Sequence, residues 1–158
     1  MCGIVGWVNF NTPPSREIVE KMNQRLIHRG PDFGSVLNLG PAVFGHRRLS
    51  IIDLSEISNQ PFLSVCGEFS IVFNGEIYNY QDLRRELSQY GASFKSEGDA
   101  EVILEAYKRW GIEFLKKLNG MFAFAIWDLK ANQLLLARDR LGEKPLYYSF
   151  DKNGGLFF

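Results

Sequence analysis

Four short, continuous apolar runs limit the folds that this sequence can adopt. They cover Gly3–Val8 and residues 70–73, 121–127 and 134–137. Runs of this length that contain aromatic and β-branched residues are typical of strands buried on both faces. Residues 121–127 also fit a helix, because Ala123 and Ala125 favour one, but Gly120 before them and the short length favour a strand.

Three longer segments have the apolar spacing of amphipathic helices. The residues that share a face are Ile18, Val19, Met22 and Leu26 in the first, Tyr80, Leu83, Leu87 and Tyr90 in the second, and Ile103, Ala106, Tyr107 and Trp110 in the third. Asn79 and Asp99 are the expected N-caps of the last two, and Gly91 and Gly111 their expected ends. A short fourth helix is expected over residues 113–118.

The expected strands outnumber the helices and are grouped, which favours a layered α+β architecture with mixed or antiparallel sheets. Residues 154–158 resemble the start of another strand, and a chain that stopped there would leave an open sheet edge. We therefore expect residues 1–158 to form one domain at the front of a longer protein.

Composition excludes several classes of protein. The 46% of hydrophobic residues is enough for a core, and eighteen basic residues balance eighteen acidic ones, which argues against binding to nucleic acid or a membrane surface by charge. No apolar run approaches the ~20 residues of a transmembrane helix, and the N-terminus does not resemble a signal peptide. Two cysteines without metal-ligand spacing favour a reducing, cytoplasmic location.

Cys2 is the first candidate for chemistry. A thiol attacks as the thiolate and needs a base, but neither His28 nor His46 has a recognisable catalytic setting. Removal of Met1 would give Cys2 a free α-amine with a pKa of about 7.7–8.0, which suits a general base. Nucleophile and base would then belong to one residue. Taken by position alone, however, Cys2 is more simply a residue of the first strand.

Six motifs along the chain resemble those of one known family. They are Cys2-Gly3-Ile4-Val5-Gly6, Arg29-Gly30-Pro31-Asp32, the segment 45–53 with Asn59-Gln60-Pro61, the segment 73–79, Gly98-Asp99-Ala100-Glu101, and the pair of segments 119–124 and 138–148. In this order they resemble class II glutamine amidotransferases, the N-terminal nucleophile hydrolases, in the form found in asparagine synthetases.

The resemblance implies a four-layer αββα fold and a mechanism. Cys2 would attack the side-chain amide of L-glutamine, and water would hydrolyse the resulting thioester. Asn74 and Gly75 would form the oxyanion hole, although Asn-Gly is also a common tight turn. Arg48, rather than Arg47, would hold the α-carboxylate of glutamine.

The remaining expected substrate contacts are also implied by the resemblance. Glu76 and Asp99 would bind the α-ammonium group, and Leu49, Ser50, Ile51, Ile52 and Gly98 would line the pocket. The simpler interpretations are a surface Arg48, a solvated Glu76 and an Asp99 that only caps a helix. Cys66, His28 and His46 are expected to be structural, and Arg138, Asp139 and Lys144 to stabilise a turn.

The expected partners follow from the same family. This domain should need no cofactor and no metal, whereas a C-terminal synthetase domain, absent from these residues, would use ATP and Mg²⁺ to activate a carboxylate, with aspartate as the default acceptor. A homodimer is a further arrangement that we consider for this domain. The alternatives are an N-terminal nucleophile hydrolase acting on another amide, and a non-catalytic regulatory domain of the same fold.

Overall fold

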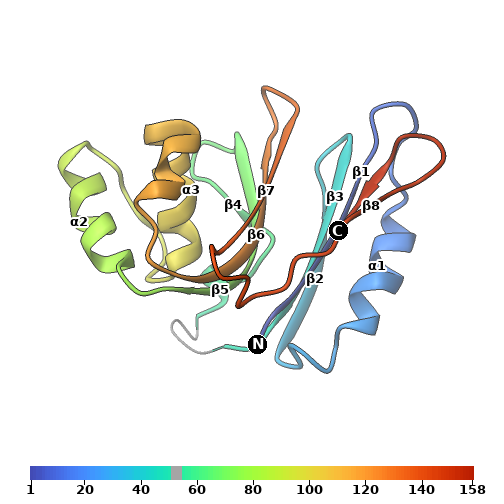
Figure 1. Cartoon of the computed structure of the whole chain (residues 1–158), viewed down its shortest axis with the longest axis horizontal. Helices are drawn as coiled ribbons and strands as arrows, with labels where there is room; N and C mark the ends of the chain where they lie inside the picture. The colour runs from blue at the N-terminus through green and yellow to red at the C-terminus, as the bar shows by residue number, and fades with distance from the viewer. Residues whose placement is uncertain (51–54) are drawn as a thin grey trace.

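The structure has four layers, in the order helix, sheet, sheet, helices (Figure 1). It is a computed structural model that describes residues 1–50 and 55–158. Helix α1 (Arg16–Arg25) covers one sheet, and α2 (Tyr80–Gln89) and α3 (Asp99–Trp110) cover the other. The predicted α+β class and αββα layering are confirmed. None of the helices in the described residues is long and apolar enough to span a bilayer.

The first sheet has five strands in the order β2-β3-β1-β9-β8, all antiparallel. These strands are β1 (Gly3–Val8), β2 (Phe33–Asn38), β3 (Ala42–Arg48), β8 (Ser149–Phe150) and β9 (Leu156–Phe157). The strand expected near residue 156 is therefore present, but the open edge expected there is wrong, because β9 pairs with β1 on one side and β8 on the other.

The second sheet has four antiparallel strands in the order β4-β5-β6-β7. They are β4 (Phe62–Leu63), β5 (Phe69–Ile77), β6 (Gly120–Asp128) and β7 (Gln133–Arg138). The strand prediction for residues 121–127 is confirmed. The prediction for residues 70–73 was too short, because β5 continues to Ile77 and so includes Asn74-Gly75.

Alternation along the strands sorts the core into three apolar layers. Between the sheets lie Val8, Phe44, Val72 and Trp127, and between the second sheet and α3 lie Ile71, Phe73, Ile77, Phe122 and Phe124. Val5 and Val43 pack with Val19 of α1. Even-numbered positions of β1, β3 and β5 therefore face the space between the sheets, and this parity decides which side chains can meet there.

Helix boundaries follow the predictions; the predicted N-cap Asp99 is wrong, whereas Asn79 is the N-cap of α2 as predicted but without a side-chain cap bond. The N-cap of α3 is Gly98, and Asp99 is its first helical residue, whose Oδ2 accepts from the Ile77 N–H at 3.0 Å. The side chain of Asn79 makes no cap bond to α2, because it bonds instead to Lys117 and Asn119. The expected fourth helix is the 3₁₀ segment η2 (Gly111–Lys116), and a second such segment, η1, covers Glu56–Ser58.

Candidate active site

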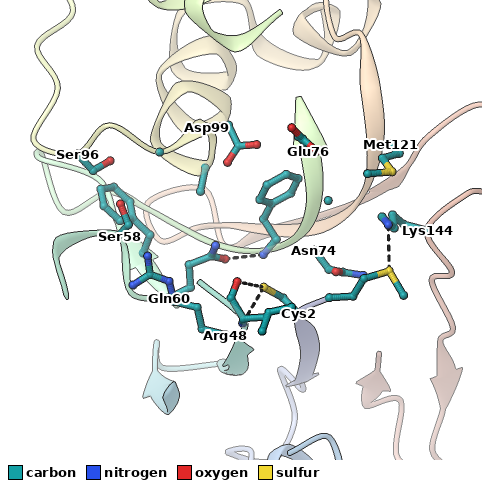
Figure 2. A pocket seen from close by; sticks show the side chains of 17 residues that line it. Cys2, Arg48, Ser58, Gln60, Asn74, Glu76, Ser96, Asp99, Met121 and Lys144 are labelled. Atoms are coloured by element: carbon teal, nitrogen blue, oxygen red, sulfur yellow. Dashed lines mark hydrogen bonds between the residues drawn. The ribbon is translucent and has the colours of Figure 1, made fainter. Parts of the chain in front are cut away.

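Cys2 lies one residue ahead of β1, at the mouth of the space between the two sheets (Figure 2). Its Sγ is 3.5 Å from the Leu49 backbone N and 3.7 Å from the Leu49 backbone O. The Arg29 Nε donates to the Cys2 carbonyl at 3.1 Å. The thiol is thus held between β1 and the residue that follows β3, while its main chain is fixed by an arginine from the loop after α1.

One pocket gathers most of the predicted site residues. The predicted residues that line it are Cys2, Arg48, Leu49, Asn74, Gly75, Glu76, Gly98 and Asp99. Ser50 is not among the lining residues; its backbone N–H donates to Asp32 Oδ2 at 2.8 Å, which fixes the chain just after Leu49. Ile51 and Ile52 lie outside the described residues. Residues from both sheets and from α3 therefore converge on a single cavity.

Parity explains why Arg48 rather than Arg47 reaches the pocket. Arg48 is an even position of β3 and faces the second sheet, whereas Arg47 bonds to Asn23 and Gln24 of α1 on the opposite face. Both arginines are buried. The Arg48 Nη1 donates to the Ser55 carbonyl at 2.8 Å and to Asn59 Oδ1 at 2.7 Å, so Arg48 also holds the segment around η1.

Asn74 and Gly75 lie in the middle of a strand pair, opposite Ala123 and Phe122 of β6. The tight-turn interpretation is therefore wrong. A Cβ at Gly75 would lie 2.2 Å from the Met121 carbonyl oxygen, so glycine is needed because two backbones approach closely. Asn74 is an even position, and its buried side chain faces the space at whose mouth Cys2 lies.

The free edge of β5 presents a row of backbone N–H groups to the pocket. The backbone N–H and C=O of Phe122 both bond to Asp139, so they point away from Gly75, its partner across the strand pair. Gly75 and Phe122 are therefore a pair without mutual hydrogen bonds, and the Gly75 N–H points away from β6. On that edge the Phe73 N–H donates to Gln60 Oε1 at 2.7 Å and the Ile77 N–H to Asp99 Oδ2. The Gly75 N–H lies between these two side-chain-capped positions.

Two carboxylates form an acidic end of the pocket. Asp99 is only 7% exposed, and burial, opposed by the bond from Ile77 and reinforced by the charge of Glu76, raises the pKa of its carboxyl to about 6. Glu76 is half-buried on β5 and lines the same cavity. At neutral pH the two groups favour a cationic ligand group.

Among the residues that the structure describes, the hydrogen-bond partners of the Cys2 thiol are backbone atoms of Leu49, and none is a side-chain base. Burial raises the pKa of its thiol above the ordinary value, although the Leu49 backbone, the chain's N-terminal charge and Arg48 act in the opposite direction. Met1 itself lines the pocket. Removal of Met1 would open this space and create an α-amine on the residue that carries the thiol.

Several lining residues were not predicted as site residues. They are Met1, Ser58, Gln60, Phe62, Phe73, Ser96, Ala100, Met121 and Lys144. Gln60 and Lys144 belong to motifs that were recognised, Asn59-Gln60-Pro61 and the segment 138–148. Their polar side chains inside those motifs were the available signal; Lys144 had been assigned only to a turn.

The residues that were expected to be structural rather than catalytic include Asp139, His46 and Cys66. Asp139 does stabilise a turn, since its carboxylate accepts from the backbone N–H groups of Leu141, Glu143 and Lys144. His46 is fully buried and bonds through Nε2 to the Phe73 carbonyl at 3.1 Å, whereas the Cys2 thiol contacts the backbone of Leu49. Cys66 is exposed beside Ser64.

Comparisons with known proteins bear on the family and on the fold. The model of the glutamine amidotransferase domain family matches residues 1–158. The asparagine synthetase (glutamine-hydrolyzing) 3 of Bacillus subtilis is 41% identical over 99% of this chain, and its paralogue 1 is 44% identical over 94%. The chain spans about a quarter of the length of these relatives, 26% and 24%.

A solved structure supports the fold independently of close sequence similarity. The glutamine phosphoribosylpyrophosphate amidotransferase from B. subtilis superposes with a TM-score of 0.80 at 20% identity, covering 98% of this chain and 40% of that protein. An identity this low bears on the fold alone, whereas the family match spans every residue of the chain. On the evidence of that match and of relatives more than 40% identical, the chain belongs to the glutamine amidotransferase domain family.

Proposed function

We propose that this domain hydrolyses L-glutamine to L-glutamate and ammonia, with Cys2 as the N-terminal nucleophile once Met1 is removed. The observation that carries the proposal is the convergence of the Cys2 thiol, the Gly75 edge of β5 and the acidic end at Asp99 on one pocket. A free amino acid with a side-chain amide fits such a pocket, because it offers a carboxylate, an ammonium and a reacting carbonyl to three different regions.

Binding of glutamine follows from the charges. Arg48 offers a buried, planar guanidinium whose fork suits a carboxylate, and it is already anchored by Ser55 and Asn59. Glu76 and Asp99 would accept hydrogen bonds from the ammonium group. These contacts would orient the side-chain amide toward the thiol, which supplies much of the rate by proximity.

The reaction then proceeds in two balanced steps. The α-amine of Cys2 takes the thiol proton, sulfur bonds to the amide carbon, and the carbonyl oxygen becomes an oxyanion near the Asn74 amide and the Gly75 N–H. The C–N bond breaks, the amine returns the proton to nitrogen, and ammonia leaves a glutamyl thioester. Water, deprotonated by the same amine, attacks the thioester, giving glutamate and the free thiol.

The fate of the ammonia is proposed from the relatives. Relatives carry the name asparagine synthetase (glutamine-hydrolyzing), and this chain corresponds to about a quarter of their length. We propose that a C-terminal synthetase domain, with ATP and Mg²⁺, transfers the ammonia to an activated carboxylate, with aspartate as the acceptor. These 158 residues would by themselves form no asparagine.

Covalent labelling tests the nucleophile. Protein from which Met1 has been removed is treated with a diazo ketone analogue of glutamine, and the site of modification is read by mass spectrometry. We expect one adduct, on Cys2, and none in Cys2→Ala. Cys66→Ala is the matched control, because Cys66 is the second cysteine and is exposed; it should label as the unaltered protein does.

Three results would contradict the proposal. Labelling that persists in Cys2→Ala would remove the nucleophile assignment. A mature protein that retains Met1 in its source cell would favour a non-catalytic domain. Hydrolysis of other amides in preference to glutamine would favour a different N-terminal nucleophile hydrolase. Labelling is the primary measurement because it does not depend on coupling to a synthetase domain.

A further inference from the structure

The side chain of Lys144 lies inside the pocket, although its backbone belongs to the turn after β7 (Figure 2). It is 7% exposed, and its Nζ lies 3.0 Å from the Met1 Sδ. The Lys144 backbone N–H donates to Asp139 Oδ2 at 3.0 Å. The Asp139 turn therefore fixes the position of residue 144 whatever its side chain is.

The Lys144 ammonium has no carboxylate partner among residues 1–50 and 55–158. The seven ion pairs found in that part of the chain involve other residues, and the one hydrogen-bond acceptor of the Lys144 Nζ is the thioether of Met1. A thioether is a weak acceptor. A buried ammonium that lacks strong acceptors is unfavourable for folding, so packing alone does not account for a lysine here.

Met1 connects this ammonium to the position where the reaction would begin. The carbonyl carbon of Met1 is bonded to the Cys2 nitrogen, and the sulfur at the end of the Met1 side chain contacts the Lys144 Nζ. Covalent geometry plus the 3.0 Å contact therefore places the ammonium at most about 10 Å from the Cys2 nitrogen. When Met1 is removed, the Lys144 Nζ loses its sulfur contact, and the Cys2 nitrogen becomes the α-amine of a residue that lines the same pocket.

We propose that the Lys144 ammonium keeps the α-amine of Cys2 in its neutral, proton-accepting form in the processed chain. Lys144 acts through the amine and is thus a positioning residue of the glutaminase reaction, an inference that rests on the proposed function. A positive charge nearby disfavours protonation of the amine. Since only the neutral amine can take the thiol proton, its neutral fraction sets the rate below pH 8.

In the described part of the chain, the other charged side chains near Cys2 carry both signs. Arg29, which bonds to the Cys2 carbonyl, and Arg48 on β3 act in the same direction as Lys144. Glu76 on β5 and Asp99 on α3 favour a protonated amine. The Cys2 thiol adds a negative charge once it ionises. Lys144 is therefore placed to decide the balance in favour of the neutral amine.

Direct titration of the amine tests this inference. Cysteine labelled with ¹⁵N and ¹³Cα gives a single site in a Cys66→Ala background, because the chain has two cysteines. Thiol ionisation is followed separately by thiolate absorbance. We expect Lys144→Met to move the amine's titration midpoint up by about 0.5–1 pH unit, as for one charge removed at roughly 8 Å in a partly buried pocket.

The kinetic counterpart is the rate at which the diazo ketone analogue labels Cys2. At pH 6.5 Lys144→Met should label about 3–10-fold more slowly than the unaltered protein, and the two rates should converge near pH 9. Lys144→Arg keeps the charge and should restore the rate. Lys130→Met is the matched control, because it removes the same charge from the exposed turn between β6 and β7, which does not line the pocket. Lys144→Gln replaces Lys144→Met if the methionine variant misfolds.

The outcomes separate this inference from the proposed function. An unmoved midpoint in both Lys144→Met and Lys144→Gln overturns the inference. So does a change confined to half-saturation by the analogue, since that assigns Lys144 to substrate binding. If unaltered protein is not labelled at Cys2, the proposed function fails, while the amine titration still decides for or against Lys144.

Discussion

At the scale of single residues, Asn74 shows how strand geometry prepares a polar group for chemistry. Its backbone is held in register with Ala123, and its side chain is buried on the face toward Cys2. A buried amide fixed in this way needs no reorganisation when an oxyanion forms. The same property makes Asn74 testable, because its side chain can be removed while the strand's backbone pairing remains.

We predict that Asn74→Ala lowers the rate of glutamine hydrolysis by about 10²–10³-fold, with a small change in KM, because one donor to the oxyanion is lost. The rate is measured as glutamate release by protein lacking Met1. Asn74→Asp is the matched variant: it keeps the shape and removes the NH₂ donor, so it should be equally slow. Retention of more than a tenth of the activity in either variant would assign the oxyanion to other donors.

At the scale of secondary-structure elements, the strands show where sequence patterns suffice and where they do not. The apolar runs in β1, β5 and β6 were recognisable, because burial on both faces leaves continuous hydrophobic stretches, and the run in β7 was recognisable although that strand is only half-buried. Strand β3 was not predicted. It ends in His46-Arg47-Arg48, three polar residues that are all buried, since each has specific partners on one face or the other.

Turn signals failed for a related reason. Asn74-Gly75 has the composition of a hairpin turn, yet the dipeptide lies within β5 because the glycine lets β6 approach. Aspartate is a residue type that often caps helices, yet the Asp99 carboxylate accepts a hydrogen bond from the Ile77 N–H of β5. Gly75 and Asp99 both make contacts with segments that are distant in the sequence. The local sequence does not indicate which distant segment will lie beside a residue.

A prediction at this scale concerns the β5–β6 approach. Gly75→Ala should reduce the free energy of unfolding by about 2–4 kcal/mol, because the new methyl group would meet the Met121 carbonyl oxygen and the Phe122 Cα at 2.2 and 2.7 Å. Urea denaturation of the processed protein measures the change.

Ser70→Ala, in the same strand, is the control for the Gly75 variant. The Ser70 Oγ is buried and has no hydrogen-bond partner in the described part of the chain, so its removal should be neutral or slightly stabilising. Equal destabilisation by Gly75→Ala and Ser70→Ala would show that β5 tolerates no substitution at all, and would remove the backbone-approach explanation.

At the scale of the whole molecule, the site depends on residues that are far apart in the sequence. The motifs around Cys2, Arg48, Asn74 and Asp99 could be recognised one by one, and the structure brings them to one pocket. Lys144 could not be placed from sequence, because its position depends on how the turn after β7 returns to the N-terminus. Proximity across 143 positions is a property of strand order.

A hydrogen bond between the sheets ties the site to global stability. His46 of β3 donates from Nε2 to the Phe73 carbonyl of β5, and complete burial lowers the pKa of His46 to about 4. His46 therefore stabilises the fold above pH 6.5, and this contribution is lost as pH falls toward 4. Asp99 has the opposite effect: with its pKa raised to about 6, its contribution is full below pH 3.8 and is lost as pH rises through 6.

We predict that these two groups compensate between pH 4.5 and 6.5. In His46→Gln the contribution of Asp99 to the free energy of unfolding should fall as pH rises across this window, by about 2 kcal/mol, because His46 no longer opposes it. In Asp99→Asn the contribution of His46 should rise by a similar amount, because Asp99 no longer opposes it. Urea denaturation at both pH values measures each change, and subtracting the result for the double variant His46→Gln/Asp99→Asn removes the contributions of all other groups. Parallel pH profiles for His46→Gln and the unaltered protein would mean that folding does not lower the pKa of His46, and burial of this ring would then have no role in acid stability.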